Sequence, residues 1–288
     1  MAAETASPGA PQSVRIDGRA AGALALSDRG LHYGDGLFET IACLGGRPRF
    51  LERHLERLAQ GCGRLGIGFP GREVLRREIL AAAGEADRAV VKVLLTRGPA
   101  VARGYAVAGS ERPTRVMLRY PWESEDPALA RAGVRVRIAA LRLGENPHLA
   151  GLKHLNRLEQ VEARREWSGG EIAEALMFSS SGRLISGVMS NVFLVAGGRL
   201  RTPLLDRCGV AGIMRRIVLR EAARAGIAAE EAPLEGADLS GARELFLTSA
   251  LIGVRPVREL DGRPCEIGPL TRELQRRLAP LLAEATDG

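Results

Sequence analysis

The chain has 288 residues, of which 45% are hydrophobic and 26% are charged, and its formal net charge is +7. This length allows a substantial core in one large or two smaller domains, and no apolar run reaches the ~18 residues that would predict a membrane helix. The arginines are dispersed and aromatic residues make up only 4%, which argues against a nucleic-acid partner and leaves a small anionic substrate as the expected use of the charge.

Residues 1–12 are small and polar and lack the basic and apolar regions of a secretory signal, so they are expected to form a disordered lead-in. The four cysteines, at 43, 62, 208 and 265, are scattered and have no His or Cys neighbours at metal-ligand spacing. This pattern argues against a metal site or a disulfide framework and is typical of the reducing cytoplasm.

Residues 13–120 are predicted to form a smaller N-terminal domain of strands and two helices. A strand at 14–16 is expected to pair with 24–27 across a tight turn. Leucines at helical spacing predict an amphipathic helix at 50–65. The other expected elements are a loop at 28–36, strands at 38–43, 49–50, 89–96 and 114–120, and a helix at 73–83.

A polar, proline-containing stretch at 121–126 is the predicted linker, and residues 127–288 are predicted to form a larger domain that carries Lys153. The other elements expected here are strands at 134–139, 174–178, 183–185, 191–195 and 244–248, with 174–185 forming a hairpin, and helices at 155–167, with Asn156 as a candidate cap, 214–225 and 270–285. Helices and strands do not alternate strictly, which favours an α+β fold with two lobes.

Lysine is rare in this chain, because only Lys92 and Lys153 are lysines among 41 lysine and arginine residues. An ordinary surface cation can be either residue. A nucleophilic amine must be lysine, since guanidinium stays protonated while an ammonium group can lose its proton and form a Schiff base. Lys153 is therefore the candidate for covalent chemistry, with a leftover surface lysine as the alternative. For Lys92, a packed stem with a paired head group is the default expectation.

Such a lysine in a chain without a metal site suggests pyridoxal phosphate, a cofactor that supplies an electron sink while the protein orients the reactants. A phosphate site is then needed. Gly212-Ile213 opens a predicted helix, where free N–H groups favour an anion. Ser249-Ala250 follows a strand, and the fork of Arg57 suits phosphate. Each signal is weak alone, because turn chemistry explains the glycine and a solvated helix face explains the arginine.

Six segments resemble the fold-type IV pyridoxal phosphate family, which includes branched-chain and D-amino acid aminotransferases. The resemblance implies a two-lobed α+β fold like that of D-amino acid aminotransferase, pyridoxal 5'-phosphate as cofactor, and a homodimer. The segments are DRGLHYGDGLFET (28–40), RHLERL (53–58), KHLNRLEQV (153–161), SNVFLV (190–195), GVAGIMRR (209–216) and TSALIGVRPV (248–257).

Carried over by position, Lys153 resembles the lysine that bonds the cofactor, and Arg57 resembles the arginine that binds its phosphate. The resemblance implies further cofactor contacts from Val210 on the ring face, from Ile213 and Met214 at the phosphate, and from Ser249 and Ala250.

Two segments resemble the lyase members of the family, which convert 4-amino-4-deoxychorismate to 4-aminobenzoate and pyruvate toward folate. KHLNRLEQV is similar to the lyase version of the lysine motif. TRGPAVARGYAV (96–107) is similar to a substrate loop, so Arg97, Arg103 and Tyr105, with Phe38, are expected to meet a dicarboxylate. A surface turn with incidental arginines is the alternative for the loop. A D-amino acid or branched-chain aminotransferase, or a non-catalytic anion- or nucleic-acid-binding protein, is the alternative for the function.

The chain departs from the family pattern at Ser186, where the family usually has a carboxylate that holds the cofactor's ring nitrogen protonated. A serine hydroxyl adds no charge and so weakens the electron sink. We hypothesise that this disfavours transamination more than β-elimination. The negative charge on the substrate carbon must persist for transamination, whereas elimination needs it only until the leaving group departs. A shifted alignment, or another acid in this role, is the alternative.

Overall fold

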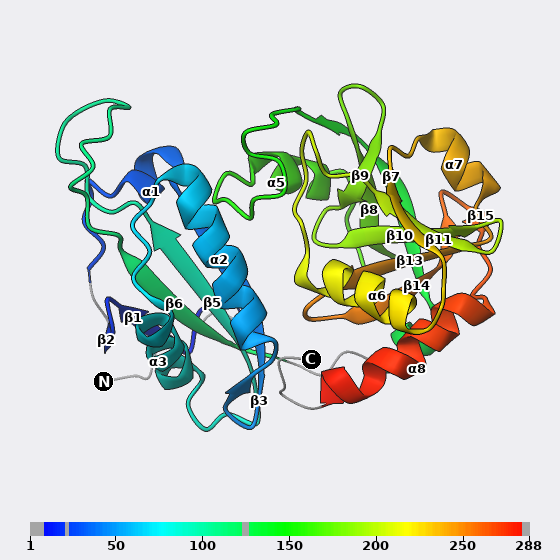
Figure 1. The fold of residues 1–288 in the computed structure, drawn as a ribbon, viewed down its shortest axis with the longest axis horizontal. Coiled ribbons are helices and arrows are strands. Elements are labelled where there is room, and N and C mark those ends of the chain that lie inside the picture. The colour runs from blue at the N-terminus through cyan, green and yellow to red at the C-terminus, as the bar shows by residue number, and fades with distance from the viewer. Residues whose placement is uncertain (1–8, 21–22, 123–126, 284–288) are drawn as a thin grey trace. The chain divides into compact units, whose positions relative to one another are not determined.

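The computed structural model describes residues 9–20, 23–122 and 127–283, and the chain divides into two compact units (Figure 1). Of the described residues, the first unit holds those up to 122 together with Lys153–Asn156, and the second holds 127–152 and 157–283. The predicted lead-in falls outside the described residues over 1–8, and so does the predicted linker over 123–126.

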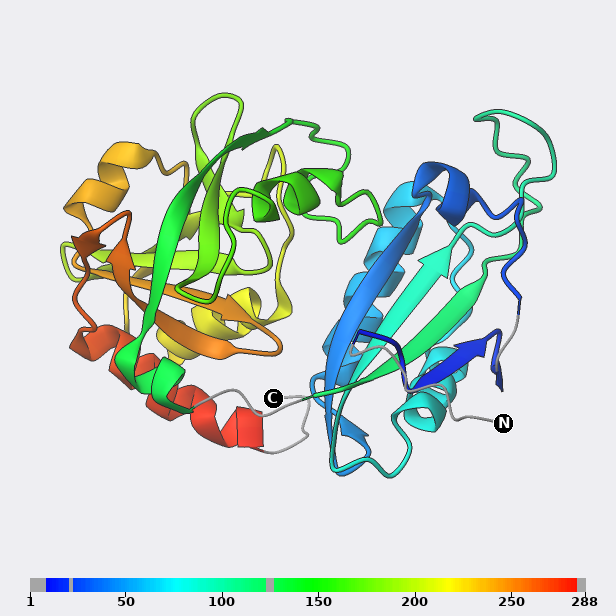
Figure 2. The same ribbon diagram turned by 180° about the vertical axis from the view of Figure 1, so that it is seen from behind.

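The first unit is an antiparallel sheet with two helices on one face. Its elements are β1 (Ser13–Ile16), β2 (Arg19–Ala20), α1 (Arg29–Tyr33), β3 (Gly36–Leu44), β4 (Arg47–Pro48), α2 (Leu51–Leu65), α3 (Arg72–Ala83), β5 (Arg88–Thr96) and β6 (Arg115–Pro121). The strand order is β2-β1-β6-β5-β3-β4. Figure 2 shows the strands from the face opposite α2 and α3.

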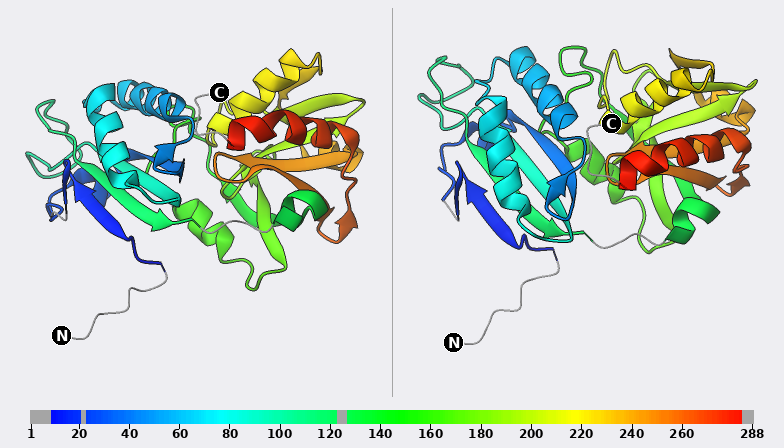
Figure 3. Two further views of the ribbon diagram at one scale, coloured as in Figure 1. Left: turned by 90° about the horizontal axis from the view of Figure 1, so that it is seen from below. Right: turned by 60° about the horizontal axis from the view of Figure 1, so that its bottom comes forward.

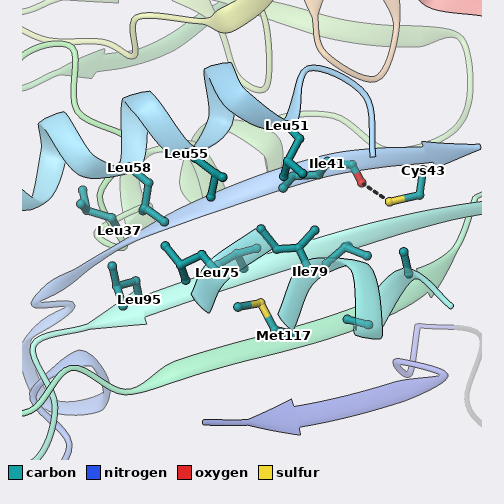
Figure 4. Packing of buried hydrophobic residues seen from close by; sticks show 14 of the residues in the cluster. Leu37, Ile41, Cys43, Leu51, Leu55, Leu58, Leu75, Ile79, Leu95 and Met117 are labelled. Carbon is teal, nitrogen blue, oxygen red and sulfur yellow. Dashed lines mark hydrogen bonds between the residues drawn. The ribbon is translucent and has the colours of Figure 1, made fainter. Parts of the chain in front are cut away.

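The core of the first unit lies between the sheet and these two helices. Leu55 and Leu58 of α2 and Ile79 of α3 pack with Leu37 and Ile41 of β3 (Figure 4). Because side chains alternate along a strand, the odd-numbered residues of β3 face the helices and the even-numbered residues face the other side.

Most of the elements predicted for this unit are confirmed, with three differences. The strand predicted at 49–50 is wrong, because the return strand is β4 at Arg47–Pro48 and residues 49–50 form a turn before α2. The other two differences lie near the start of the unit. The partner of β1 is β2 rather than 24–27, because Asp17 and Gly18 both have positive φ, 49° and 77°, and close a two-residue hairpin. The predicted loop at 28–36 contains α1, whose first turn is capped by the Asp28 side chain accepting from the Gly30 N–H.

The second unit is built on a nine-stranded mixed sheet, in the order β12-β11-β10-β13-β14-β7-β8-β9, with β15 paired to β14. Helices α6 and α8 lie next to each other along β13 (Figure 3). The elements are α4 (Pro127–Ala132), β7 (Val134–Leu143), α5 (Leu158–Arg164), β8 (Ile172–Ser179), β9 (Leu184–Gly187), β10 (Asn191–Ala196), β11 (Arg199–Pro203), α6 (Ile213–Arg224), β12 (Ala229–Ala232), α7 (Gly236–Gly241), β13 (Glu244–Ser249), β14 (Gly253–Leu260), β15 (Arg263–Pro264) and α8 (Pro269–Ala283).

The α+β class and the β8–β9 hairpin are confirmed, but the helix predicted at 155–167 starts three residues later, at Leu158. Residues 153–156 are instead grouped with the first unit. Asn156 does not cap the helix, and its side-chain amide donates to the carbonyl of Gly34 at 3.1 Å. No helix in the described ranges has the length and hydropathy to cross a bilayer.

Candidate active site

Lys153 is held against the start of β3 by its own backbone. The Phe38 N–H donates to the Lys153 carbonyl at 2.9 Å, and the Leu155 N–H donates to the Gly36 carbonyl at 3.0 Å. The Lys153 Nζ lies 4.1 Å from the centroid of the Phe38 ring. This pairing places Lys153 in the first unit, whereas the sequence predicted it in the larger C-terminal domain, and it gives the predicted nucleophile a defined position beside the predicted substrate residue Phe38.

Gly151, two residues before Lys153, is fixed by the backbone around Val210. Its N–H donates to the Gly209 carbonyl at 2.9 Å, and its carbonyl accepts from the Ala211 N–H at 3.0 Å. Its φ of 79° is one that favours glycine. Backbone pairing on both of its sides therefore fixes Gly151 within the second unit.

Arg57 is held in one orientation by a buried carboxylate. Its Nε donates to Oε1 of Glu39 at 2.8 Å, and its Nη2 donates to Oε2. Nδ1 of His54 lies 2.6 Å from the same Oε2. Glu39 projects from the helix-facing side of β3, and its side chain is only 2% exposed. His54 and Arg57 lie one turn apart on α2, so both can reach it.

The charges of this trio follow from its burial. Burial by itself raises the pKa of Glu39, but Arg57 and His54 outweigh it and lower that pKa to about 2. Burial lowers the pKa of His54, and this outweighs the opposing effect of Glu39. The carboxylate is therefore ionised and the imidazole neutral near pH 7, with Nδ1–H as the donor. Among the described residues, His54 Nε2 is a buried atom without a hydrogen-bond partner.

Glu39 and His54 were missed by the sequence prediction, although a signal was present. Glu39 alternates with Leu37 and Ile41, so its parity puts it on the buried face of the strand. His54 adjoins Leu55 on the apolar stripe of α2. A charged residue at a buried position usually has a partner, and here that partner is the predicted phosphate arginine.

The remaining predicted cofactor residues belong to the second unit, and all of them except Ser186 lie near the same end of two paired strands. Asn191 begins β10 and pairs with Thr248, near the end of β13. Its side-chain amide donates to the Val210 carbonyl at 2.9 Å. Ser249 ends β13 directly after Thr248, Ala250 begins the turn that follows, and both are partly exposed. Three segments that are distant in sequence therefore become neighbours around Asn191.

The start of α6 suits an anion. Ile213 and Met214 are its first residues, and no side chain of the described residues caps this end. The first N–H groups of a helix have no intrahelical partner and attract negative charge. The preceding Gly212 is tightly enclosed, because a Cβ there would lie 2.0 Å from Oδ1 of Asn191.

Replacing Gly212 with alanine is expected to weaken binding of pyridoxal phosphate about tenfold, because the added methyl group forces Asn191 or the helix start to move. The dissociation constant would be measured by absorbance titration of the cofactor-free chain. Gly236→Ala is the matched control, since a Cβ at Gly236 meets nothing within 4 Å. Equal affinities for the two variants would contradict a role for this turn.

Ser186 lies on β9 directly opposite Met177 of β8. The acid of this hairpin, Glu174, lies three residues from Met177 and therefore faces the other side of the sheet. Its carboxylate accepts the Val188 N–H and the Ser190 hydroxyl, both at 3.0 Å. Burial raises the pKa of Glu174, and this effect outweighs that of the hydrogen bonds, which lower it. Glu174 thus stabilises the turn after β9 and does not take the place of the carboxylate that Ser186 replaces.

Arg97, predicted to meet the substrate, is bound to other parts of the first unit. Its Nε and Nη2 donate to the two carboxylate oxygens of Asp35, at 2.8 and 3.1 Å. Its Nη1 and Nη2 also donate to the carbonyls of Gly66 and Leu65, at 2.7 and 2.8 Å. Four hydrogen bonds therefore join this buried guanidinium, which follows β5, to Asp35 and to the end of α2, and its contact with a substrate remains a prediction.

Arg103 and Tyr105 lie on the exposed loop that follows. The buried guanidinium of Arg29 donates to the carbonyls of Gly104, Tyr105 and Ala106 at 3.1 to 3.3 Å. Tyr105 is nevertheless 83% exposed. Arg29 therefore holds the loop backbone while the two side chains stay exposed, and their contact with a substrate remains a prediction.

Each unit offers groups that fit pyridoxal phosphate. The first unit offers the Lys153 amine and the Arg57 guanidinium, whose plane Glu39 fixes. The second unit offers the uncapped start of α6, where Gly212 leaves no room for a side chain. An amine for the aldehyde and cationic or N–H groups for the phosphate are the donor types that this cofactor requires.

Residues 36–260 match the model of a family described as amino-transferase class IV. The chain is 34% identical to an aminodeoxychorismate lyase from Vibrio harveyi, over 88% of this chain and 94% of that protein. It is similar to the crystal structure of 4-amino-4-deoxychorismate lyase from Pseudomonas aeruginosa, with a TM-score of 0.89 and 45% identity over 93% of this chain and 98% of that one. A hypothetical aminotransferase from Mycobacterium tuberculosis, in a PLP-bound form, shares the fold at a TM-score of 0.80 and 22% identity over 95% and 98% of the two chains.

Proposed function

The chain belongs to the class IV amino-transferase family, and on that premise we propose that it is a pyridoxal phosphate-dependent lyase that converts 4-amino-4-deoxychorismate to 4-aminobenzoate and pyruvate. The observation that carries this proposal is the position of Lys153, whose backbone is paired with β3 and whose amine lies over Phe38. The 45% identity to the Pseudomonas lyase supports the lyase branch of the family.

In this function, bound pyridoxal phosphate supplies an electron sink for the amine-bearing carbon of the substrate. Lys153 would hold the cofactor through its amine, and the Lys153 amine would take the proton from the amine-bearing ring carbon. The same amine would return a proton to the enolpyruvyl oxygen as the carbon–oxygen bond breaks and the ring becomes aromatic. Within the first unit, Arg57 would bind the phosphate, and Glu39 keeps the Arg57 fork in a fixed plane. Within the second unit, the first N–H groups of α6 are of the kind that bind phosphate.

The proposal extends to the assembly and its compartment. We place the enzyme in the cytoplasm as a homodimer that acts on a small anionic substrate. All four cysteines are free, which suits a reducing compartment. The loop carrying Arg103 exposes Val101 and Tyr105, and exposed apolar side chains of this kind suit contact with a second subunit. Light scattering on the purified protein would measure the assembly directly.

Reduction with borohydride tests the covalent part of this proposal. The purified protein is expected to be yellow, and borohydride is expected to fix the cofactor on the peptide that contains Lys153. Because Lys92 is the only other lysine, peptide mass spectrometry separates the two sites without ambiguity. Reduced cofactor on Lys92, or a protein that takes up no cofactor, would overturn the assignment of Lys153.

Ser186 separates this chain from an aminotransferase of the same family. A Ser186→Glu variant is expected to gain transaminase activity of about tenfold or more with D-alanine or a branched-chain amino acid, because a carboxylate near the ring nitrogen strengthens the electron sink. The transferred amino group would be measured on 2-oxoglutarate. Ser186→Ala, which removes the hydroxyl without adding charge, is the control. Equal transaminase rates for the two variants would contradict the role given to this position.

A further inference from the structure

The two lysines of the chain share one aromatic ring. Lys92 Nζ lies 5.6 Å from the centroid of the Phe38 ring, and Lys153 Nζ lies 4.1 Å from it. The separation of the two amines therefore cannot exceed the sum of these distances. Only these two of the 41 basic residues are lysines. Chance is therefore a poor explanation for both of them lying near the Phe38 ring.

Lys92 sits in the middle of a central strand. It pairs with Thr40 of β3 on one side and with Leu118 of β6 on the other. Its neighbours Val91 and Val93 are buried against the helices, so the half-buried Lys92 side chain lies on the opposite face. Within the described parts of the chain it has no hydrogen bond or ion pair, and the expectation of a paired head group is wrong.

His54 of α2 is one charged or titratable neighbour of Lys153, and it belongs to a trio with Glu39 of β3 and Arg57 of α2. Glu39 is ionised, but its two oxygens bind Arg57 and His54. His54 is neutral, and after burial and Arg57, the charge of Lys153 is among the causes that lower the pKa of His54. Glu39 and Arg57 offset each other, whereas no described carboxylate binds Lys92. Among the described residues, the ammonium group of Lys92 is therefore a cation beside the Phe38 ring that no carboxylate binds.

We propose that Lys92 is a positioning residue whose charge disfavours the protonated form of Lys153 and so keeps the Lys153 amine reactive near neutral pH. The inference rests on the proposed function of Lys153 as the reactive amine. A like charge nearby disfavours the charged form of a half-buried amine, and a second cation is a known way to activate a lysine amine. A compact ammonium fits beside Lys153 on one ring, whereas a planar guanidinium would stack on that ring itself.

The test measures the reactivity of Lys153 in the full-length chain without cofactor. Trinitrobenzenesulfonate would be applied in limiting amount across a pH range, and the labelling rate at Lys153 would be followed by peptide mass spectrometry. In Lys92→Met the midpoint of the pH–rate profile is expected to rise by about half to one pH unit, which slows labelling at neutral pH about three- to tenfold.

Arg88→Met is the matched control. Arg88 has the same parity on β5 as Lys92, but its guanidinium stacks on Trp122, 4.5 Å from the ring centroid, rather than on Phe38. This variant removes a cation from the same strand and is expected to leave the Lys153 profile unchanged. An unchanged profile in Lys92→Met, or an equal shift in both variants, would overturn the inference.

The labelling experiment can fail separately from the proposed function. If Lys92→Met leaves the profile unchanged while the enzyme with cofactor still forms 4-aminobenzoate, only the role of Lys92 is lost. If borohydride finds no cofactor on Lys153, the premise of the inference is lost with it. Circular dichroism at each pH would show that a changed profile belongs to a folded chain.

Discussion

Replacing Lys153 with alanine is expected to lower the rate of 4-aminobenzoate formation at least about ten-thousandfold, because one amine both bonds the cofactor and transfers the proton. Lys153 Nζ lies 4.1 Å from the centroid of the Phe38 ring. The Nζ of Lys92, the other lysine of the chain, lies farther from this ring, at 5.6 Å. The rate would be measured by the fluorescence of 4-aminobenzoate with added pyridoxal phosphate.

The matched control is Lys153→Arg, which keeps the positive charge and much of the side-chain length. Guanidinium stays protonated and cannot bond the cofactor or act as a base, so this variant is expected to be as inactive as Lys153→Ala. Circular dichroism would establish that both variants fold. An arginine variant that kept more than about one hundredth of the activity would show that Lys153 acts through its charge alone.

Replacing Glu39 with glutamine is expected to lower the free energy of unfolding by about 3 kcal/mol at pH 7, from a shift of the Glu39 pKa between 4.5 and about 2. The same change is expected to weaken binding of pyridoxal phosphate, because Arg57 loses the carboxylate that orients it. Urea denaturation would measure the first effect and absorbance titration the second. Both effects follow from leaving two buried donors without their anion.

The pH dependence of this effect has a definite sign. The pKa of Glu39 is lower in the folded chain than the ordinary value of 4.5. Its stabilising contribution is therefore complete above pH 4.5 and is lost as the pH falls toward 2. Over this window the unfolding free energy should fall more steeply in the unmodified chain than in Glu39→Gln.

Glu73→Gln is the control for this experiment, because the Glu73 side chain is 82% exposed and its ion pair with Arg76 is at the surface. Surface pairs contribute little to stability, so this variant should unfold like the unmodified chain. A Glu39→Gln variant that lost no more stability than Glu73→Gln would contradict the buried charge network.

The parts of the fold that were predicted from sequence are those with a local signal. The leucine stripe of α2 and the apolar run of β5 define their own elements over many residues. The partner of β1 was predicted wrongly as 24–27. More than one short segment after β1 could pair with it, and the two-residue turn at Asp17 and Gly18 selects β2. The 153–156 segment was predicted in the wrong domain because its partner, the start of β3, is far away in sequence.

In the candidate site, too, the residues with a local sequence signal were predicted, and the tertiary contacts were not. Lys153 was predicted from the scarcity of lysine, and the resemblance supplied Arg57. The resemblance also gave Arg97 as a substrate residue, which stays a prediction, but the sequence did not show that the main-chain carbonyls of Leu65 and Gly66 bind its guanidinium. Glu39 was detectable from its parity in the strand, but its partners come from a helix whose packing on the sheet is a tertiary feature.

The central claim is that this chain eliminates pyruvate from 4-amino-4-deoxychorismate, and a time course of both products tests it most directly. The purified protein with pyridoxal phosphate would be mixed with the substrate, and 4-aminobenzoate and pyruvate would be measured in the same samples. Equal amounts of the two products, formed at the same rate over many turnovers and absent with Lys153→Ala, are the predicted result. A yellow protein that forms neither product but transfers amino groups between amino acids and 2-oxo acids would contradict the claim and make the chain an aminotransferase.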